Sequence, residues 1–162
     1  MMLKFQVQAK IQKPLAEVFD AVYNPKKLSA YFTSGGSDGP LDEGHTVLWT
    51  FADMAGQSET VPVKVEKMIR NKLIRFKWAA SEGIYAPEEG KMPHPGGYNT
   101  TVDITFEALD KKETLVKIIE GEWHPTEDGL HGSYQNCQGW TNMSCCLKAY
   151  LEYDINLRKG FF

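Results

Sequence analysis

The stretch that decides the fold is Gln138–Arg158, which reads QGWTNMSCCLKAYLEYDINLR near the end of the chain. Its apolar residues recur at steps of three and four, the spacing that places side chains on one face of an α-helix. That face comprises Trp140, Met143, Ser144, Leu147, Tyr150, Leu151, Asp154 and Leu157. No proline interrupts the run, Arg158 lies where a helix dipole favours a cation, and Gly160 offers a stop. We therefore expect a helix of about 20–25 residues.

This helix must lie on a broad apolar surface, and its own apolar face is interrupted. Ser144 and Asp154 occur among the apolar positions. Polar residues are expected there if part of the face lines a cavity instead of a dry core.

Most of the remaining chain alternates apolar and polar residues, which is typical of half-buried β-strands. The strands predicted in this way are Leu3–Ile11, Thr46–Phe51, Thr60–Ile69, Leu73–Trp78, Thr100–Ala108 and Thr114–Trp123. Two helices are predicted between the first two strands, one from Pro14 to Asn24 and a shorter one over Lys26–Tyr31. The polar turn Arg70–Lys72 predicts an antiparallel hairpin between its neighbouring strands.

The segments rich in Gly, Pro and polar residues are predicted to be connections. They are Thr33–Gly44, a loop or weak edge strand, the turn Asp53–Glu59, the long loop Ala79–Tyr98, and Pro125–Gly132, a loop into the last helix. Loops as long as Ala79–Tyr98 are uncommon in compact domains and are often lids or binding loops.

The composition is that of a globular protein, with 42% hydrophobic and 24% charged residues in 162. We expect one domain over residues 1–162. A net charge of −3 without a basic cluster argues against nucleic acid as a partner. No apolar run is long enough to insert into a membrane, and no secretory leader is apparent, so we expect a cytoplasmic protein. Cys137, Cys145 and Cys146 lack the spacing of a zinc site or a disulfide framework.

Four stretches carry a resemblance to a known family: IQKPLAEVFDAV at Ile11–Val22, NKLIRFKW at Asn71–Trp78, ETLVKI at Glu113–Ile118, and GW at Gly139–Trp140. They resemble proteins related to the C-terminal domain of the heat-shock-protein-90 ATPase activator, within the START-like (SRPBCC) superfamily of lipid-transfer proteins and polyketide cyclases. The resemblance implies an α+β helix-grip fold. In this fold a curved antiparallel β-sheet wraps around a long C-terminal α-helix, two short helices follow the first strand, and a cavity lies between sheet and helix.

The sequence shows no catalytic signature such as G-x-S-x-G, H-E-x-x-H or a P-loop. His45, His94, His124 and His131 all fall in predicted loops. A metal site built from His124, His131 and either Glu120 or Glu122 is conceivable, but loop histidines are more often solvated. We therefore expect no metal, no cofactor and no catalytic residue.

The candidate ligand-binding residues are those predicted to point into the cavity. They are Trp49, Phe51, Trp78, Ile104, Ile118, Glu120, Trp123, Trp140, Met143, Ser144 and Leu147. Glu120 and Glu122 share the parity of Val116 and Ile118, so a carboxylate there could face the cavity and act as an acid or base. The simpler interpretation, which we favour from sequence, is that the strand ends near Glu120 and both carboxylates lie in water.

Two kinds of function fit this reading. The first is a START-like domain that binds a small hydrophobic molecule or lipid, as a monomer or homodimer. The second is a protein-interaction module, a cochaperone that stimulates a chaperone ATPase in the stress response. A polyketide-cyclase-like enzyme is a more distant third.

Overall fold

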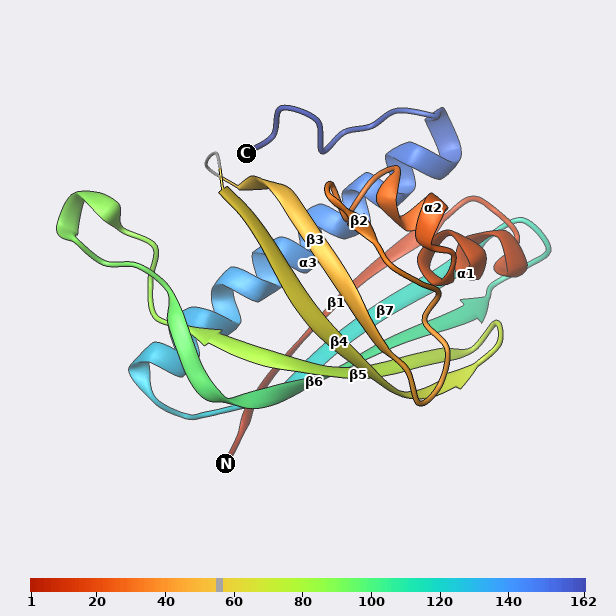
Figure 1. Cartoon of the computed structure of the whole chain (residues 1–162). Helices are drawn as coiled ribbons and strands as arrows, with labels where there is room; N and C mark the ends of the chain where they lie inside the picture. The colour runs from red at the N-terminus through yellow and green to blue at the C-terminus, as the bar shows by residue number, and fades with distance from the viewer. Residues whose placement is uncertain (55–56) are drawn as a thin grey trace.

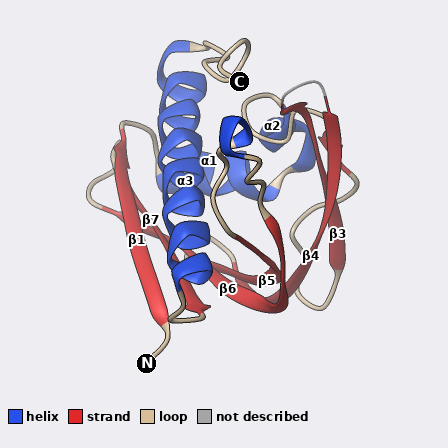
Figure 2. Ribbon diagram, turned by 90° about the vertical axis from the view of Figure 1, so that its left-hand side faces the viewer, coloured by secondary structure: helices blue, strands red, loops and turns tan. Residues whose placement is uncertain are grey.

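One antiparallel sheet wraps around a long helix in the structure, a computed structural model that describes residues 1–54 and 57–162 (Figure 1). The elements are β1 (Leu3–Ile11), α1 (Leu15–Tyr23), α2 (Pro25–Ser29), β2 (Gly36–Ser37), β3 (Thr46–Met54), β4 (Gln57–Ile69), β5 (Leu73–Glu82), the 3-10 turn η1 (Pro87–Glu89), β6 (His94–Ala108), β7 (Thr114–Trp123) and α3 (Glu127–Tyr153). The seven strands lie in the order β1-β7-β6-β5-β4-β3-β2. Figure 2 shows the sheet curving around α3, and Figure 1 shows α1 and α2 together at one end of the sheet. The predicted helix-grip fold is confirmed.

Local sequence explains where the short helices begin and end. Val18, Phe19 and Val22 are fully buried on one face of α1. Asn24 ends α1, and its side chain accepts a hydrogen bond of 3.0 Å from the Lys26 amide, which caps α2. Pro25 occupies the first position of α2, where its missing N–H costs nothing.

The long helix α3 is displaced toward the N-terminus from its predicted position. It begins at Glu127 instead of Gln138, so the prediction of a loop over Pro125–Gly132 is wrong. Thr126 caps the helix by accepting a hydrogen bond of 3.0 Å from the Gly129 amide, and two acidic residues follow in the first turn, where the helix dipole favours them.

The same helix ends at Tyr153, because Asp154 adopts a left-handed conformation with φ of 53°. Leu157 and Arg158 therefore lie outside the helix, contrary to the sequence prediction, and the stop predicted at Gly160 lies beyond its end. The tail turns back over α3 toward the end of β3 (Figure 1). There Arg158 forms two hydrogen bonds to Asp53, of 2.6 and 3.0 Å.

A glycine sets the close approach of α3 to β5. A Cβ atom on Gly132 would overlap the Ser81 carbonyl oxygen and come within 2.9 Å of the Trp123 ring. Gly132, which makes this segment look like a loop, is thus required by the packing between helix and strand.

The strands agree with the alternation pattern, but two of the predicted connections are shorter than expected. β5 continues to Glu82 and β6 begins at His94, with Ser81 opposite Pro95 in the ladder, so much of Ala79–Tyr98 is hairpin and not loop. The base of this hairpin is fixed to α3, since the Gly83 amide donates to the Asp128 carbonyl over 3.0 Å. Its tip extends beyond the sheet (Figure 1).

The second shortened connection is Asp53–Glu59, whereas Thr33–Gly44 agrees with its prediction. The predicted turn Asp53–Glu59 includes residues 55 and 56, which lie outside the described residues, and its flanks belong to β3 and β4. Thr33–Gly44 contains the short edge strand β2, as one of its two interpretations foresaw.

Candidate functional site

The centre of the candidate site is the carboxylate of Glu120, which is 0% exposed. Its Oε1 accepts hydrogen bonds from Trp78 Nε1 at 2.8 Å and from Thr100 Oγ1 at 2.6 Å. Its Oε2 accepts one from Trp140 Nε1 at 2.8 Å. The Asn136 amide nitrogen lies 3.2 Å from both oxygens. Four neutral side chains therefore hold one buried carboxylate.

Three neighbouring strands and the helix bring these groups together. Trp78 on β5 lies opposite Thr100 on β6, and Glu120 lies on β7, the next strand of the sheet. Asn136 and Trp140 are four residues apart on α3, so they share one helix face. The site consequently exists only when the sheet has closed around the helix.

No ion pair among the described residues involves Glu120. Burial raises the pKa of Glu120, and the hydrogen bonds from Thr100, Trp78, Trp140 and Asn136 offset only part of that effect. The sequence interpretation that placed this carboxylate in water is therefore wrong. Glutamate is rarely buried without a partner, but here β7 continues to Trp123, and α3 begins early enough to cover this part of the strand.

A bulge in β7 separates the two glutamates that the sequence placed on one face. The pairing of β7 with β1 slips just after Glu120, and Glu122 has a φ of 68°. Glu122 therefore turns to the outer face, where Thr101 and Lys77 bond to it at 2.5 and 3.2 Å and lower its pKa. Trp123 turns inward and is 0% exposed. The prediction that Glu122 shares the inward parity is wrong, because a bulge shifts the two-residue period.

Aromatic rings pack beside the carboxylate. The centroids of Trp78 and Trp140 are 5.4 Å apart, and those of Trp49 and Trp78 are 6.0 Å apart. Phe32, Phe51 and Phe76 complete the cluster by ring contacts. The buried Nε1 of Trp49 has no hydrogen-bond partner among the described residues.

The structure brings most of the remaining candidate residues into the same core. Ile104, Ile118, Met143 and Leu147 are buried in it. Ser144 is 7% exposed, and its hydroxyl donates to the Trp140 carbonyl over 2.9 Å. Trp123 is fully buried but lies outside this cluster, near Gly132 at the start of α3.

Four residues of the site are not among those predicted from the sequence: Phe32, Phe76, Thr100 and Asn136. Phe76 shares the strand parity of Trp78, so the alternation pattern could have included it. Asn136 precedes Trp140 by one helical turn, but the helix was predicted to start after it. Thr100 could be placed only from the strand register.

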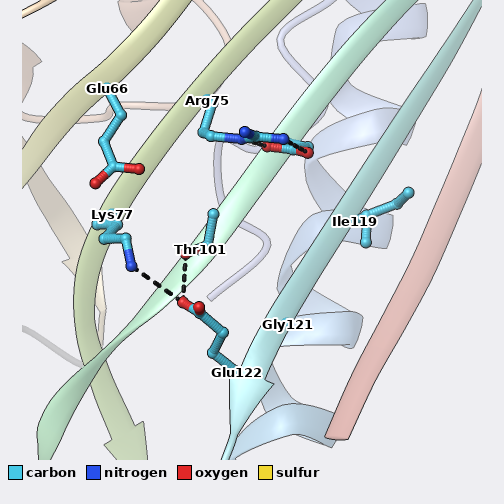
Figure 3. Close-up of a pocket in the computed structure, with 8 residues that line it drawn as sticks. Glu66, Arg75, Lys77, Thr101, Ile119, Gly121 and Glu122 are labelled. Carbon is cyan, nitrogen blue, oxygen red and sulfur yellow. Dashed lines mark hydrogen bonds and ion pairs between the residues drawn. The ribbon is translucent and has the colours of Figure 1, made fainter. Parts of the chain in front are cut away.

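Two shallow hollows lie on the outer face of the sheet. Figure 3 shows the first, where Lys77 and Thr101 point to Glu122. Arg75 donates two hydrogen bonds to Asp103 in the same hollow, of 2.7 and 2.8 Å. The interior pocket predicted from the sequence stays a prediction, because the rings beside Glu120 pack directly against one another.

Of the histidines predicted in loops, His94 begins β6 and His131 lies within α3, so the prediction is wrong for these two. His94 Nε2 lies 3.3 Å from Asp128, and the His124 ring stacks on Tyr98 at 3.6 Å between centroids. Within residues 1–54 and 57–162, no three His, Cys, Asp or Glu side chains are grouped so as to hold a metal ion. No helix in those ranges is long and apolar enough to cross a membrane.

The family model described as activator of Hsp90 ATPase homolog 1-like protein matches residues 12–152. The chain belongs to this family. The match to the Hsp90-activator family confirms the resemblance that the sequence motifs carry. Comparison with curated proteins finds no match.

Several solved structures have the same fold. SSP2350 from Staphylococcus saprophyticus is 22% identical, with a TM-score of 0.70 and 96% of each chain covered. The Aha1 dimer from Colwellia psychrerythraea is 20% identical, with a TM-score of 0.67, 93% of this chain and 97% of that chain covered. DynU16, from the dynemicin biosynthetic locus, is 19% identical with a TM-score of 0.71, and the match covers 94% of this chain but 48% of DynU16. At these identities the similarity shows the fold alone.

Proposed function

We propose that this protein is a START-like domain that binds a small, mainly apolar molecule between the sheet and α3, with Glu120 as the polar anchor. The observation that carries the proposal is the buried carboxylate. Transferring a carboxylate out of water is costly, and no cation among the described residues offsets that cost for Glu120. A perturbed carboxylate of this kind, placed among aromatic rings, is more typical of a site than of a core.

We expect a ligand to reach this anchor at the edge between β5 and α3. Trp78 and Asn136 are both partly exposed, whereas Glu120, Thr100 and Trp140 are buried. A ligand would enter by moving the Trp78 ring away from Trp140, and the two rings would then form its walls. The apolar end of the ligand would contact the buried candidates Ile104, Ile118, Met143 and Leu147.

A titration with an apolar fluorescent dye, followed by tryptophan emission, tests this function. Ser144→Phe fills the interior beside Trp140 and should abolish dye binding, while Thr141→Phe, on the exposed side of α3, should leave it unchanged. Urea titrations of both variants check that each one folds. If the wild-type protein binds no dye, or Ser144→Phe binds as well as Thr141→Phe, ligand binding in the interior is excluded.

The family match favours one second candidate, a cochaperone that acts through its surface in the cytoplasm. On this alternative the charged outer face with Arg75, Asp103 and Lys77 would contact a chaperone, and the buried site would be structural. The ATPase rate of a chaperone from the same source, measured with and without this protein, separates the alternatives. A cyclase activity related to that of polyketide enzymes stays a third possibility, for which no residue is assigned.

A further inference from the structure

The interior of the grip contains a second carboxylate without an ion pair. Glu82, at the end of β5, is 9% exposed, and its bound donor is the Tyr98 hydroxyl at 2.7 Å. Burial, the hydrogen bond to Glu82 and the charges of Glu82 and Glu120 together raise the pKa of Tyr98 to about 12. Tyr98 and Thr100 lie close together on β6, and Thr100 donates to Glu120, so the two carboxylates lie at the same end of the grip.

No lysine or arginine balances either carboxylate. None of the ion pairs between described residues includes Glu82 or Glu120, and the nearest cation along β5, Lys77, points outward to Glu122. Buried charges are normally paired, because an unpaired charge loses its hydration without compensation. The missing charge is thus a positive one.

The Asn136 amide occupies the place where that charge would fit. Its nitrogen bridges both oxygens of Glu120 at 3.2 Å, whereas the other three donors lie at 2.6–2.8 Å. Charge-assisted hydrogen bonds between nitrogen and carboxylate are typically shorter, about 2.7–2.9 Å. Asn136 is also partly exposed, so it is the donor most easily displaced.

The aromatic rings around this position suit the apolar body of an organic cation. Trp78 and Trp140 reach the carboxylate with their N–H edges, and their rings pack beside Trp49 and Phe76. A site of this composition provides a counter-charge for the head and apolar contacts for the body.

We infer that the ligand is an amphiphilic amine, whose ammonium group displaces Asn136 from Glu120 while its apolar body lies among the rings. This inference rests on the proposed function and specifies the chemical class of the ligand. The groups that recognise it are Glu120, Trp78 and Trp140, with Glu82 adding negative potential at the same end.

Three probes with the same ring system test the inference by calorimetry: naphthylmethylamine, naphthylmethanol and naphthylacetate. The amine should bind about tenfold tighter than the alcohol, the order expected of a charge-assisted bond over a neutral one. The carboxylate probe should bind most weakly. The preference for the amine should vanish in Glu120→Gln and persist in Glu122→Gln, a matched change on the outer face of the same strand.

The outcomes separate this inference from the function on which it rests. If the alcohol binds as tightly as the amine, or the amine preference survives in a folded Glu120→Gln variant, the ligand is not an amine, although the interior still binds apolar molecules. If none of the three probes binds, the interior site itself is excluded. Should Glu120→Gln fail to fold, the ranking of the probes on the wild-type protein decides alone.

Discussion

Trp140 donates its indole N–H to Oε2 of Glu120 over 2.8 Å, and this bond ties α3 to β7 inside the grip. Both residues are buried, with Trp140 2% exposed, so water cannot replace the bond if it is lost. The candidate site and the docking of the helix therefore depend on the same hydrogen bond.

Replacing Glu120 should destabilise the protein. Glu120→Leu leaves the indole N–H groups of Trp78 and Trp140 without an acceptor, which should lower the free energy of unfolding by about 2–4 kcal/mol. Glu122→Leu removes only an exposed pair with Lys77 and should cost less than about 1 kcal/mol. Urea denaturation measures both, and equal losses would show that the buried cluster does not stabilise the fold.

The buried carboxyl group of Glu120 predicts that the free energy of unfolding depends on pH. Burial raises the pKa of Glu120 above its ordinary value of 4.5, so the folded protein holds this proton more tightly than the unfolded chain does. The free energy of unfolding contributed by this group must then fall as the pH rises from 4.5 through the folded pKa. Glu120→Gln should lack this decline. A difference between the two proteins that is constant, or grows with pH, contradicts the assignment.

The approach of α3 to β5 predicts opposite effects at two glycines of one helix. Gly132→Ala would force a Cβ atom against the Ser81 carbonyl and should destabilise the protein by about 1–3 kcal/mol. Gly139→Ala meets nothing within 4 Å and should stabilise it by about 0.5–1 kcal/mol, because alanine restricts the unfolded chain. Thermal melting of the two variants checks the signs, and a stabilised Gly132→Ala would place the helix elsewhere.

The tail beyond α3 should contribute measurably to stability. Arg158 is 7% exposed, bonds to Asp53 and lies over the rings of Phe32 and Phe51 at 5.6 and 5.3 Å. Arg158→Ala should cost about 1–3 kcal/mol at neutral pH, whereas Lys159→Ala, its exposed neighbour, should cost little.

Acid should remove the stabilisation that the Arg158–Asp53 pair contributes. Burial raises the pKa of Asp53, but the hydrogen bonds from Arg158 and Ser34 outweigh burial and lower it below 3.8. The stabilisation is therefore complete above pH 3.8 and is lost as the pH falls through the lowered value. Denaturant titrations of the wild type and Arg158→Ala should converge in acid; a constant gap would mean that the arginine stabilises by packing alone.

The sequence predicts the architecture well because alternation and helical spacing report which side chains face the core. It predicts the start of α3 poorly, since Gly132 resembles a loop residue unless the crossing strand is known. The sequence does not predict the burial of Glu120, for a related reason. Whether a carboxylate is buried depends on what covers the strand, and neither Asn136 nor the bulge at Glu122 can be placed from a two-residue period.

The central claim is that a small molecule binds between Trp78 and Trp140 and contacts Glu120. The indole N–H signals of the four tryptophans in a proton–nitrogen correlation spectrum test it most directly, once each is assigned by substitution to phenylalanine. During titration with naphthylmethylamine, we expect the signals of Trp78 and Trp140 to shift together and to saturate, while that of Trp123, outside the cluster, stays in place. Unchanged Trp78 and Trp140 signals, or a shift confined to Trp123, would contradict the account.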